Sequence, residues 1–209
     1  MTTIEFYSLD SDFAVHDLYA ESEVLPGTFV GKYCESCGVA RQTRCYPLEI
    51  EWVADRSSPG STDVSDFIWP GHVNPIVVVQ RVKDAIEGRA SGHAFSPVTV
   101  RQVTRSAKRI PSPTAVPPLW EIIITGRAHM DVEASGRRIK TQCAVCDRVY
   151  YEVVDMRAQF IVPRGTWDGA EFFLIDEMGL RPFVTASAKE LLEQAGYSNL
   201  KIEQCGQIQ

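Results

Sequence analysis

The sequence predicts an α+β fold, mainly antiparallel sheet with two short helices, as one domain over residues 1–209. Short apolar runs with the two-residue period of strands recur along the chain between turn-forming segments. Apolar stripes at helical spacing occur in two short stretches. A chain of this length can bury a sizeable core, and its 44% hydrophobic and 23% charged content is ordinary for a globular protein.

Strands are predicted in order along the chain. The opening IEFYS predicts a strand, and LEIEW at 48–52 alternates apolar side chains with two glutamates, which is typical of a half-buried strand. The Pro-rich residues 111–118 are expected to form a connector. Later strands are expected in WEIIIT, RAHMDVEA, VYYEVV and QFIVP, with Gly126 as a bend between the first two.

The clearest helix is predicted over residues 187–196, where Ser187 and Glu190 fit a capping box. A weaker copy of its apolar and charged spacing lies 106 residues upstream. Both helices follow an apolar strand and precede another candidate strand. The sequence therefore suggests a duplicated strand–helix–strand unit, with repeats over 30–105 and 140–209. Chance similarity between two short amphipathic helices is the alternative.

Two Cys-x-x-Cys pairs, Cys34 with Cys37 and Cys143 with Cys146, are the most specific motif in the chain. Four thiolates suit a closed tetrahedral zinc site, and Gly38 fits the tight turn after the first pair. The pairs are 105 residues apart, which adds roughly 1.6 kcal/mol of loop-closure entropy. Structural zinc contributes about 10–16 kcal/mol, so one shared ion, bridging the halves in a zinc-ribbon-like site, is the favoured interpretation.

Three other interpretations of the cysteines stay open. A redox pair needs its first cysteine at a helix N-terminus, and neither pair precedes a convincing helix. Two disulfides fit a reducing compartment badly, and ordinary buried cysteines are the third alternative. Four protein thiolates leave no position for water, so the metal is expected to be structural. Cys45 and Cys205 lack such a partner and are expected to be small core residues.

Charge and targeting signals narrow the function classes. The net charge is −6, and residues 1–66 carry twelve acids against four bases, which opposes general nucleic-acid binding. The middle third is basic, including residues 101–109, so a local exception stays open. The N-terminus lacks the features of a secretory signal and the chain has no long apolar run, so a cytoplasmic location without membrane association is expected.

No motif indicates an enzyme. The four histidines form no HExxH or HxH pattern, and no phosphate-binding glycine motif is present in the sequence. His129 is expected to be a structural histidine in a strand, and His72 and His93 are expected in loops. The segments 65–71 and 166–175 join an acid to large aromatics, which is typical either of interface anchors or of core residues that begin a strand.

Several segments together resemble a known family. An N-terminal strand, CESCGVARQTRCYPLEI, DFIWPG with a strand and helix, CAVC, WDGAEFFLI and FVTASAKELLEQAGYSNLKIEQ are similar to the double-CXXCG-motif family, first noted as bacterial paralogues in myxobacteria. The resemblance spans most of the chain and is weakest around 90–140. It departs from the family at Asp147, which stands where the second motif has glycine.

This resemblance implies an immunity protein of a swarming-inhibition toxin system, which binds a cognate protein toxin and blocks it. The paired cysteines of the family correspond to Cys34, Cys37, Cys143 and Cys146, so a structural zinc ion is implied, while no toxin-contact residue carries over. The main alternative is a zinc-ribbon module that binds nucleic acid or acts as a regulator. A metal-dependent or thiol enzyme is the third class, and it requires a thiol or histidine with a perturbed pKa in a pocket.

Overall fold

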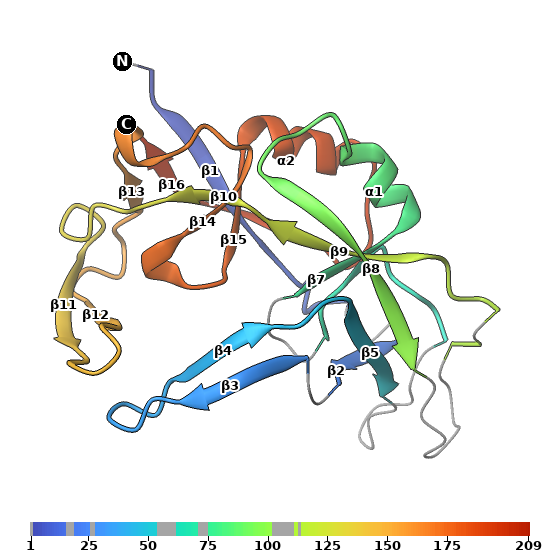
Figure 1. Cartoon of the computed structure of the whole chain (residues 1–209). Helices are drawn as coiled ribbons and strands as arrows, with labels where there is room; N and C mark the ends of the chain where they lie inside the picture. Colours follow the sequence, from blue (N-terminus) through green and yellow to red (C-terminus); the bar gives the residue numbers. More distant parts are fainter. Residues whose placement is uncertain are drawn as a thin grey trace.

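The computed structural model describes residues 2–15, 19–25, 28–53, 62–70, 75–101, 111–112 and 114–209. Over these residues the chain is mostly β-sheet with two α-helices, which agrees with the predicted α+β class (Figure 1). Two six-stranded sheets form the body, and two separate two-stranded hairpins project from it. None of the helices in the described part of the chain is long and apolar enough to cross a membrane.

The first six-stranded sheet combines the two ends of the chain. Its strands, in spatial order, are β13 (Phe160–Val162), β16 (Lys201–Ile208), β1 (Ile4–Asp10), β15 (Pro182–Thr185), β14 (Phe172–Ile175) and β10 (Gly126–Ala128). The β13–β16 and β10–β14 pairs are parallel, and the other neighbours in this sheet are antiparallel. The N-terminal strand therefore lies in the centre of a sheet that is otherwise built from the second half of the chain.

The second six-stranded sheet is built mainly from the first half. Its spatial order is β2 (Glu21–Val24), β5 (Leu48–Val53), β8 (His93–Arg101), β9 (Leu119–Ile124), β7 (Ile76–Val79) and β6 (Phe67–Ile68). Only its β5–β8 pair is parallel among the pairings described. The alternation predicted for 48–52 is confirmed, since the side chains of β5 are alternately buried and half-buried.

Each sheet contains one strand–helix–strand unit around a central strand. Helix α1 (Gln80–Ile86) joins β7 to β8, which flank β9, and α2 (Ala186–Glu193) joins β15 to β16, which flank β1. The two helices contact each other, and Figure 1 shows them side by side at one end of the body. The two units therefore have the same local topology.

Hydrogen bonds that join the two halves also occur in equivalent pairs. The Phe67 amide donates to the Ser198 carbonyl over 3.3 Å, and the Phe172 amide donates to the Ser91 carbonyl over 3.0 Å. In each case a residue that begins a short strand meets the loop after the other half's helix. Main-chain contacts of this kind fix the relative position of the two units.

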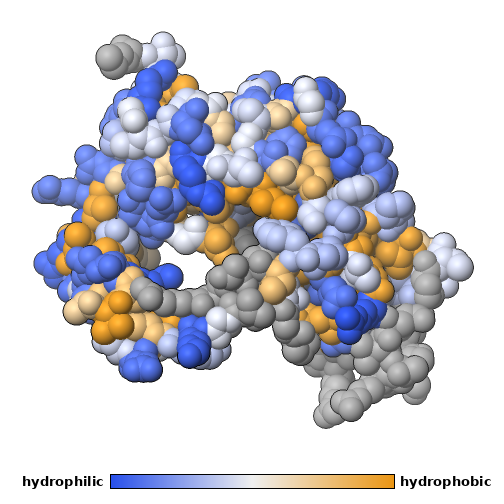
Figure 2. Space-filling view, in the orientation of Figure 1, coloured by the Kyte–Doolittle hydropathy of each residue, from blue (hydrophilic) through white to orange (hydrophobic). Residues whose placement is uncertain are grey.

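Two hairpins, here called the first and second arms, extend from the body on the side away from the helices (Figure 1). The first arm pairs β3 (Phe29–Tyr33) with β4 (Ala40–Arg44), and the second pairs β11 (Arg137–Gln142) with β12 (Val149–Val153). Figure 2 shows a gap between the second arm and the body. An isolated two-stranded hairpin is marginally stable, so the arms need support at their tips.

The core consists of two clusters that share the first sheet. One cluster lies between the sheets and both helices and includes Leu9, Phe67, Val77, Phe172 and Leu192. The other covers the opposite face of the first sheet and includes Phe6, Phe160, Phe173, Phe183 and Ile208. Aromatic contacts at centroid distances of 5.5–6.0 Å connect its phenylalanines.

Several local predictions are corrected by the structure. The capping box is wrong, because α2 begins at Ala186 after Thr185, and the Ser187 hydroxyl donates to Glu171 Oε1 over 2.7 Å instead. The strand expected in RAHMDVEA ends at Ala128, and turns follow from residue 132. The predictions for His16, for His72 and for residues 102–109 fall outside the described residues.

Candidate metal centre

The four cysteines of the two pairs lie together at the tips of the arms. Their sulfur atoms all lie within 4.8 Å of one another. Cys34 Sγ lies 3.7 Å from Cys143 Sγ, and Cys37 Sγ lies 3.6 Å from Cys146 Sγ. Four thiolates at about 2.3 Å from one tetrahedral zinc ion stand about 3.8 Å apart. The spacing of the sulfur atoms therefore fits a single metal ion.

The two turns that carry the cysteines have the same backbone geometry. The Gly38 amide donates to the Cys34 carbonyl, and the Asp147 amide donates to the Cys143 carbonyl, both over 2.8 Å. Gly38 has φ 70° and Asp147 has φ 58°, so both lie in the left-handed region. Aspartate is one of the residues that tolerate this region best. The departure from the CXXCG motif at Asp147 therefore preserves the turn.

Hydrogen bonds to the sulfur atoms favour the thiolate, which is the metal-binding form. Backbone amides of Val145 and Cys146 lower the pKa of Cys143 to about 6. A hydrogen bond from the Tyr150 hydroxyl is the largest cause of the lowered pKa of Cys37. The Tyr150 contact comes from β12 and reaches across to the first arm. A hydrogen bond from the Arg148 backbone lowers the pKa of Cys146, but burial and the neighbouring thiols outweigh it and raise that pKa to about 11. Without a cation the four thiols therefore do not ionise together, and a bound metal ion would supply the positive charge that four thiolates need.

The geometry argues against the other interpretations of the cysteines. All six cysteines are free thiols, so the structure contains no disulfide. Each pair lies in a turn between two strands and not at the N-terminus of a helix, where a redox pair is expected. Ordinary core cysteines would have no reason to bring four sulfur atoms together, and Cys37 and Cys146 are only half-buried. Four converging thiolates leave no open coordination position, so the chemistry that this donor set supports is structural.

The cluster connects the two arms. Within the described residues, the side-chain hydrogen bonds that join one arm to the other involve these cysteines and Tyr150. The arms leave the body at separate places, since the first is bounded by β2 and β5 and the second by β10 and β13. A metal ion at this site would close a ring formed by the two arms and the body.

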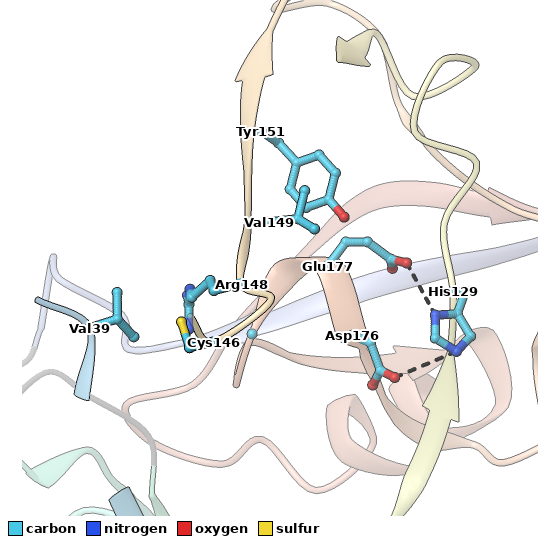
Figure 3. A pocket seen from close by; sticks show the side chains of 9 residues that line it. Val39, His129, Cys146, Arg148, Val149, Tyr151, Asp176 and Glu177 are labelled. Atoms are coloured by element: carbon cyan, nitrogen blue, oxygen red, sulfur yellow. Dashed lines mark hydrogen bonds and ion pairs between the residues drawn. The ribbon is translucent and has the colours of Figure 1, made fainter. Parts of the chain in front are cut away.

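A cavity of about 410 Å³ lies beside the cluster (Figure 3). Val39, Cys146 and Arg148 line one side, and His129 lies on the other between Asp176 and Glu177. His129 Nδ1 is 3.1 Å from Glu177 Oε1, and His129 Nε2 is 3.5 Å from Asp176 Oδ2. The carboxylates approach opposite sides of the ring, so this group holds the imidazole in place and does not chelate a metal.

The proximity of His129, Asp176 and Glu177 was not predicted from the sequence. His129 was expected within a strand, whereas it follows β10 and its side chain is 56% exposed. Asp176 and Glu177 belong to a short 3-10 helix, η4 (Asp176–Met178), and no sequence pattern distinguishes them from ordinary loop charge. No local signal links residues almost 50 positions apart. His93, expected in a loop, begins β8, and burial lowers its pKa.

The aromatic segments belong mainly to the core. Phe67, Phe172 and Phe173 are fully buried, which agrees with the core interpretation of these segments, while Trp69 and Trp167 are half-buried. Cys45 and Cys205 were expected to be core residues. Cys205 is half-buried and packs against the second core cluster, which agrees with the expectation, whereas Cys45 is half-buried and belongs to neither cluster.

Comparisons with known proteins provide no family assignment. No protein-family model matches this chain. A search of curated proteins also finds no match. The resemblance to the double-CXXCG-motif family therefore stays a prediction, and functional arguments depend on the geometry of the chain itself.

Proposed function

We propose that this chain is a non-catalytic, cytoplasmic immunity-type protein that binds and neutralises a cognate bacterial toxin. The observation that carries the proposal is the convergence of the paired cysteines, which the resemblance identifies as the family's defining feature, at one site. A structural site of this kind stabilises a binding scaffold instead of performing chemistry.

The metal of the proposal is zinc, held by Cys34, Cys37, Cys143 and Cys146. Zinc suits four thiolates in a tetrahedron and has no redox chemistry of its own. The sulfur separations and the buried position of two of the cysteines support this choice. Together the two knuckles form a zinc-ribbon-like bridge between the arms.

Rigidity explains why an inhibitor would need the bridge. An inhibitor presents roughly 800 Å² of fitted surface to its target, and ordering loops on binding reduces its affinity. The arms are two-stranded hairpins, and among their described side chains only Tyr151 packs against one of the two core clusters. Closing the ring at the tips holds both arms in one arrangement before a partner arrives.

The proposal includes an internal duplication. Supporting it are the two strand–helix–strand units around central strands β9 and β1, the equivalent amide bonds between the halves, and the two matching cysteine turns. One difference is that β2 pairs with β5, whereas β10 pairs with β14 at the other edge of its sheet. Superposition of residues 76–101 on 182–208 tests the duplication, and different helix placements on the two sheets would contradict it.

Survival of cells tests the immunity function. The product of the neighbouring gene is expressed with and without this chain, and rescue together with co-purification of the pair is the expected result. Matched samples express Cys34→Ser, which removes one metal ligand, and Cys45→Ser, which leaves all four. A harmless neighbour, or death despite expression of the folded chain, would overturn the immunity proposal.

The second candidate function is a zinc-ribbon module that binds nucleic acid or acts as a regulator, and the positive charge of the second arm favours it. Residues 136–157 carry five basic side chains against three acidic ones, although the whole chain has a net charge of −6. Phosphate contacts would make the affinity fall steeply as salt rises. Titration of labelled DNA and RNA at several salt concentrations distinguishes this candidate, since the immunity proposal expects no such binding.

A further inference from the structure

A second cavity, here called the arm groove, lies where the second arm faces the body. Its volume is about 580 Å³, which is within the usual range for binding pockets. Apolar side chains from both halves of the chain form its walls: Leu9, Phe13, Trp69, Met178, Leu180 and Pro182. Phe13 and Leu180 are more than half exposed, so large apolar surfaces face solvent there.

Two arginines face this cavity without an acidic partner. Within the described residues, neither Arg148 nor Arg181 forms an ion pair, and the described side-chain contact of Arg181 is a 3.3 Å hydrogen bond from its guanidinium to Ser8 Oγ. The remaining charged residue of the lining is Asp10, which lies directly across the sheet from Lys201. The groove therefore has an excess of positive charge in a chain whose net charge is −6.

The combination of side chains indicates what the groove would bind. An unpaired guanidinium forms bidentate hydrogen bonds with a carboxylate. Aromatic, Met and Arg side chains around one cavity are typical of the residues that are enriched in protein–protein interfaces. The aliphatic walls and the Asp10 carboxylate suit a phosphate backbone poorly. An acidic residue flanked by large apolar side chains complements both the charge and the walls.

The position of Arg148 depends on the turn that carries Cys143 and Cys146. Arg148 follows Cys146 by two residues, and its carbonyl accepts the Cys143 amide over 2.9 Å. Arg148 also lines the neighbouring cavity beside His129 (Figure 3), so the two cavities meet at this residue. The position of its guanidinium thus depends on the same turn that carries the metal ligands. A closed metal site completes the groove.

We propose that the arm groove is the docking site for a protein partner, and that it takes a segment in which Asp or Glu is flanked by large apolar residues. Arg148 and Arg181 bind the carboxylate, and Phe13, Trp69 and Leu180 contact the apolar side chains. The inference rests on the proposed function in naming the toxin as that partner and in the metal ion that holds the turn of Arg148. Metal loading and partner binding are then coupled through Arg148.

Selection from a random peptide library displayed on phage tests the groove without the toxin. The zinc-loaded full chain is the target, and enriched peptides are expected to combine Asp or Glu with Leu, Phe or Trp. Affinity for an enriched peptide should fall roughly tenfold or more in Arg148→Ala and in Arg181→Ala, since each loses a charge-assisted hydrogen bond. Arg157→Ala removes an exposed arginine outside the groove and should bind as the unchanged chain does.

Other outcomes overturn the proposal. These are failure to enrich any peptide, enrichment without acidic residues, equal binding by all three arginine variants, or preference of the groove for a single-stranded oligonucleotide probe. Circular dichroism and zinc content establish that each variant is folded and loaded. A chain that binds acidic peptides but gives no protection from the toxin retains the groove and loses the immunity function. A chain that protects from the toxin but binds no acidic peptide retains the immunity function and loses the groove.

Discussion

At Gly38 in the first arm and Asp147 in the second, the backbone makes the same left-handed turn, with φ of 70° and 58°. One position in the loops after the helices repeats this comparison, with φ of 81° at Gly92 and 57° at Asn199, while both loops also have a glycine at positive φ, Gly88 and Gly196. At the two compared positions the first half uses glycine and the second half uses Asp or Asn. The two halves thus share the backbone geometry. In the arms a residue that tolerates a positive φ satisfies it, whereas Gly92 also needs the absence of a side chain, because a Cβ there would clash with the Phe172 carbonyl oxygen.

Asp66 and Glu171, two acids that join the halves, occupy equivalent positions but differ in their hydrogen-bond partners. Asp66 accepts hydrogen bonds from Arg81 in α1 and from the amide and hydroxyl of Ser198. Glu171 accepts the Ser187 hydroxyl over 2.7 Å and the Ser91 amide over 3.0 Å. Both acids precede a short strand and reach the loop after the other half's helix. Only Asp66 has a guanidinium partner among these contacts, so its site should contribute more to stability.

The cysteine substitutions should have the largest effect. Cys34→Ser and Cys143→Ser each remove a ligand from an equivalent turn, so both should lose bound zinc. The free energy of unfolding should fall by several kcal/mol in each, because structural zinc contributes about 10–16 kcal/mol. Elemental analysis and thermal unfolding measure the two effects, with Cys45→Ser as the control. A variant that kept its zinc would show that the two arms do not contribute equally.

Replacing each acid by its amide measures how much each contributes to stability. Asp66→Asn should lower the free energy of unfolding by about 2–3 kcal/mol, because it removes charge-assisted hydrogen bonds at a side chain that is 10% exposed. Glu171→Gln should cost about 0.5–1.5 kcal/mol. Urea unfolding of both variants gives the two values, and equal losses would contradict the different strength assigned to the two sites.

The same contrast predicts a pH dependence. Burial alone raises the pKa of Asp66, but hydrogen bonds from Arg81 and Ser198 outweigh it and hold the pKa below 3.8. A depressed carboxyl pKa stabilises the fold fully at pH values above that of the unfolded chain, and this stabilisation is lost as the pH falls through the folded value. Unfolding between pH 5 and 2 should therefore be less pH-dependent in Asp66→Asn than in the unchanged chain.

The smallest effect concerns the turns of the arms. Gly38→Ala should destabilise the zinc-loaded chain by about 1–2 kcal/mol, because alanine is disfavoured at positive φ and nothing else lies within 4 Å of the new Cβ. Gly38→Asp should cost less, since Asp147 already occupies the equivalent conformation. Thermal unfolding ranks the two variants. A larger loss in Gly38→Asp would mean that the turns are not interchangeable.

The sequence alone determined the local features of this protein. The alternation in 48–52, the helix after PFVT and the apolar runs of β7 and β12 follow from the periods of the backbone. The cluster of four cysteines was predicted, because the donor type and spacing of two Cys-x-x-Cys pairs favour one shared metal ion, and their sulfur atoms do lie together. The strands β3, β4 and β11 of the arms were missed. The sequences of β4 and β11 are mainly polar and have no apolar face whose period could reveal them, and β3 is a five-residue strand with a central glycine.

Tertiary structure decided the features that depend on distant residues. It placed β1 in the sheet of the second half, joined Asp66 to Ser198, held His129 between two carboxylates and brought Arg148 and Arg181 to one groove. None of these has a local signal, because each residue's own segment is compatible with many partners. Packing of the whole chain selects among those partners, since buried polar groups and apolar faces must all be satisfied in one arrangement.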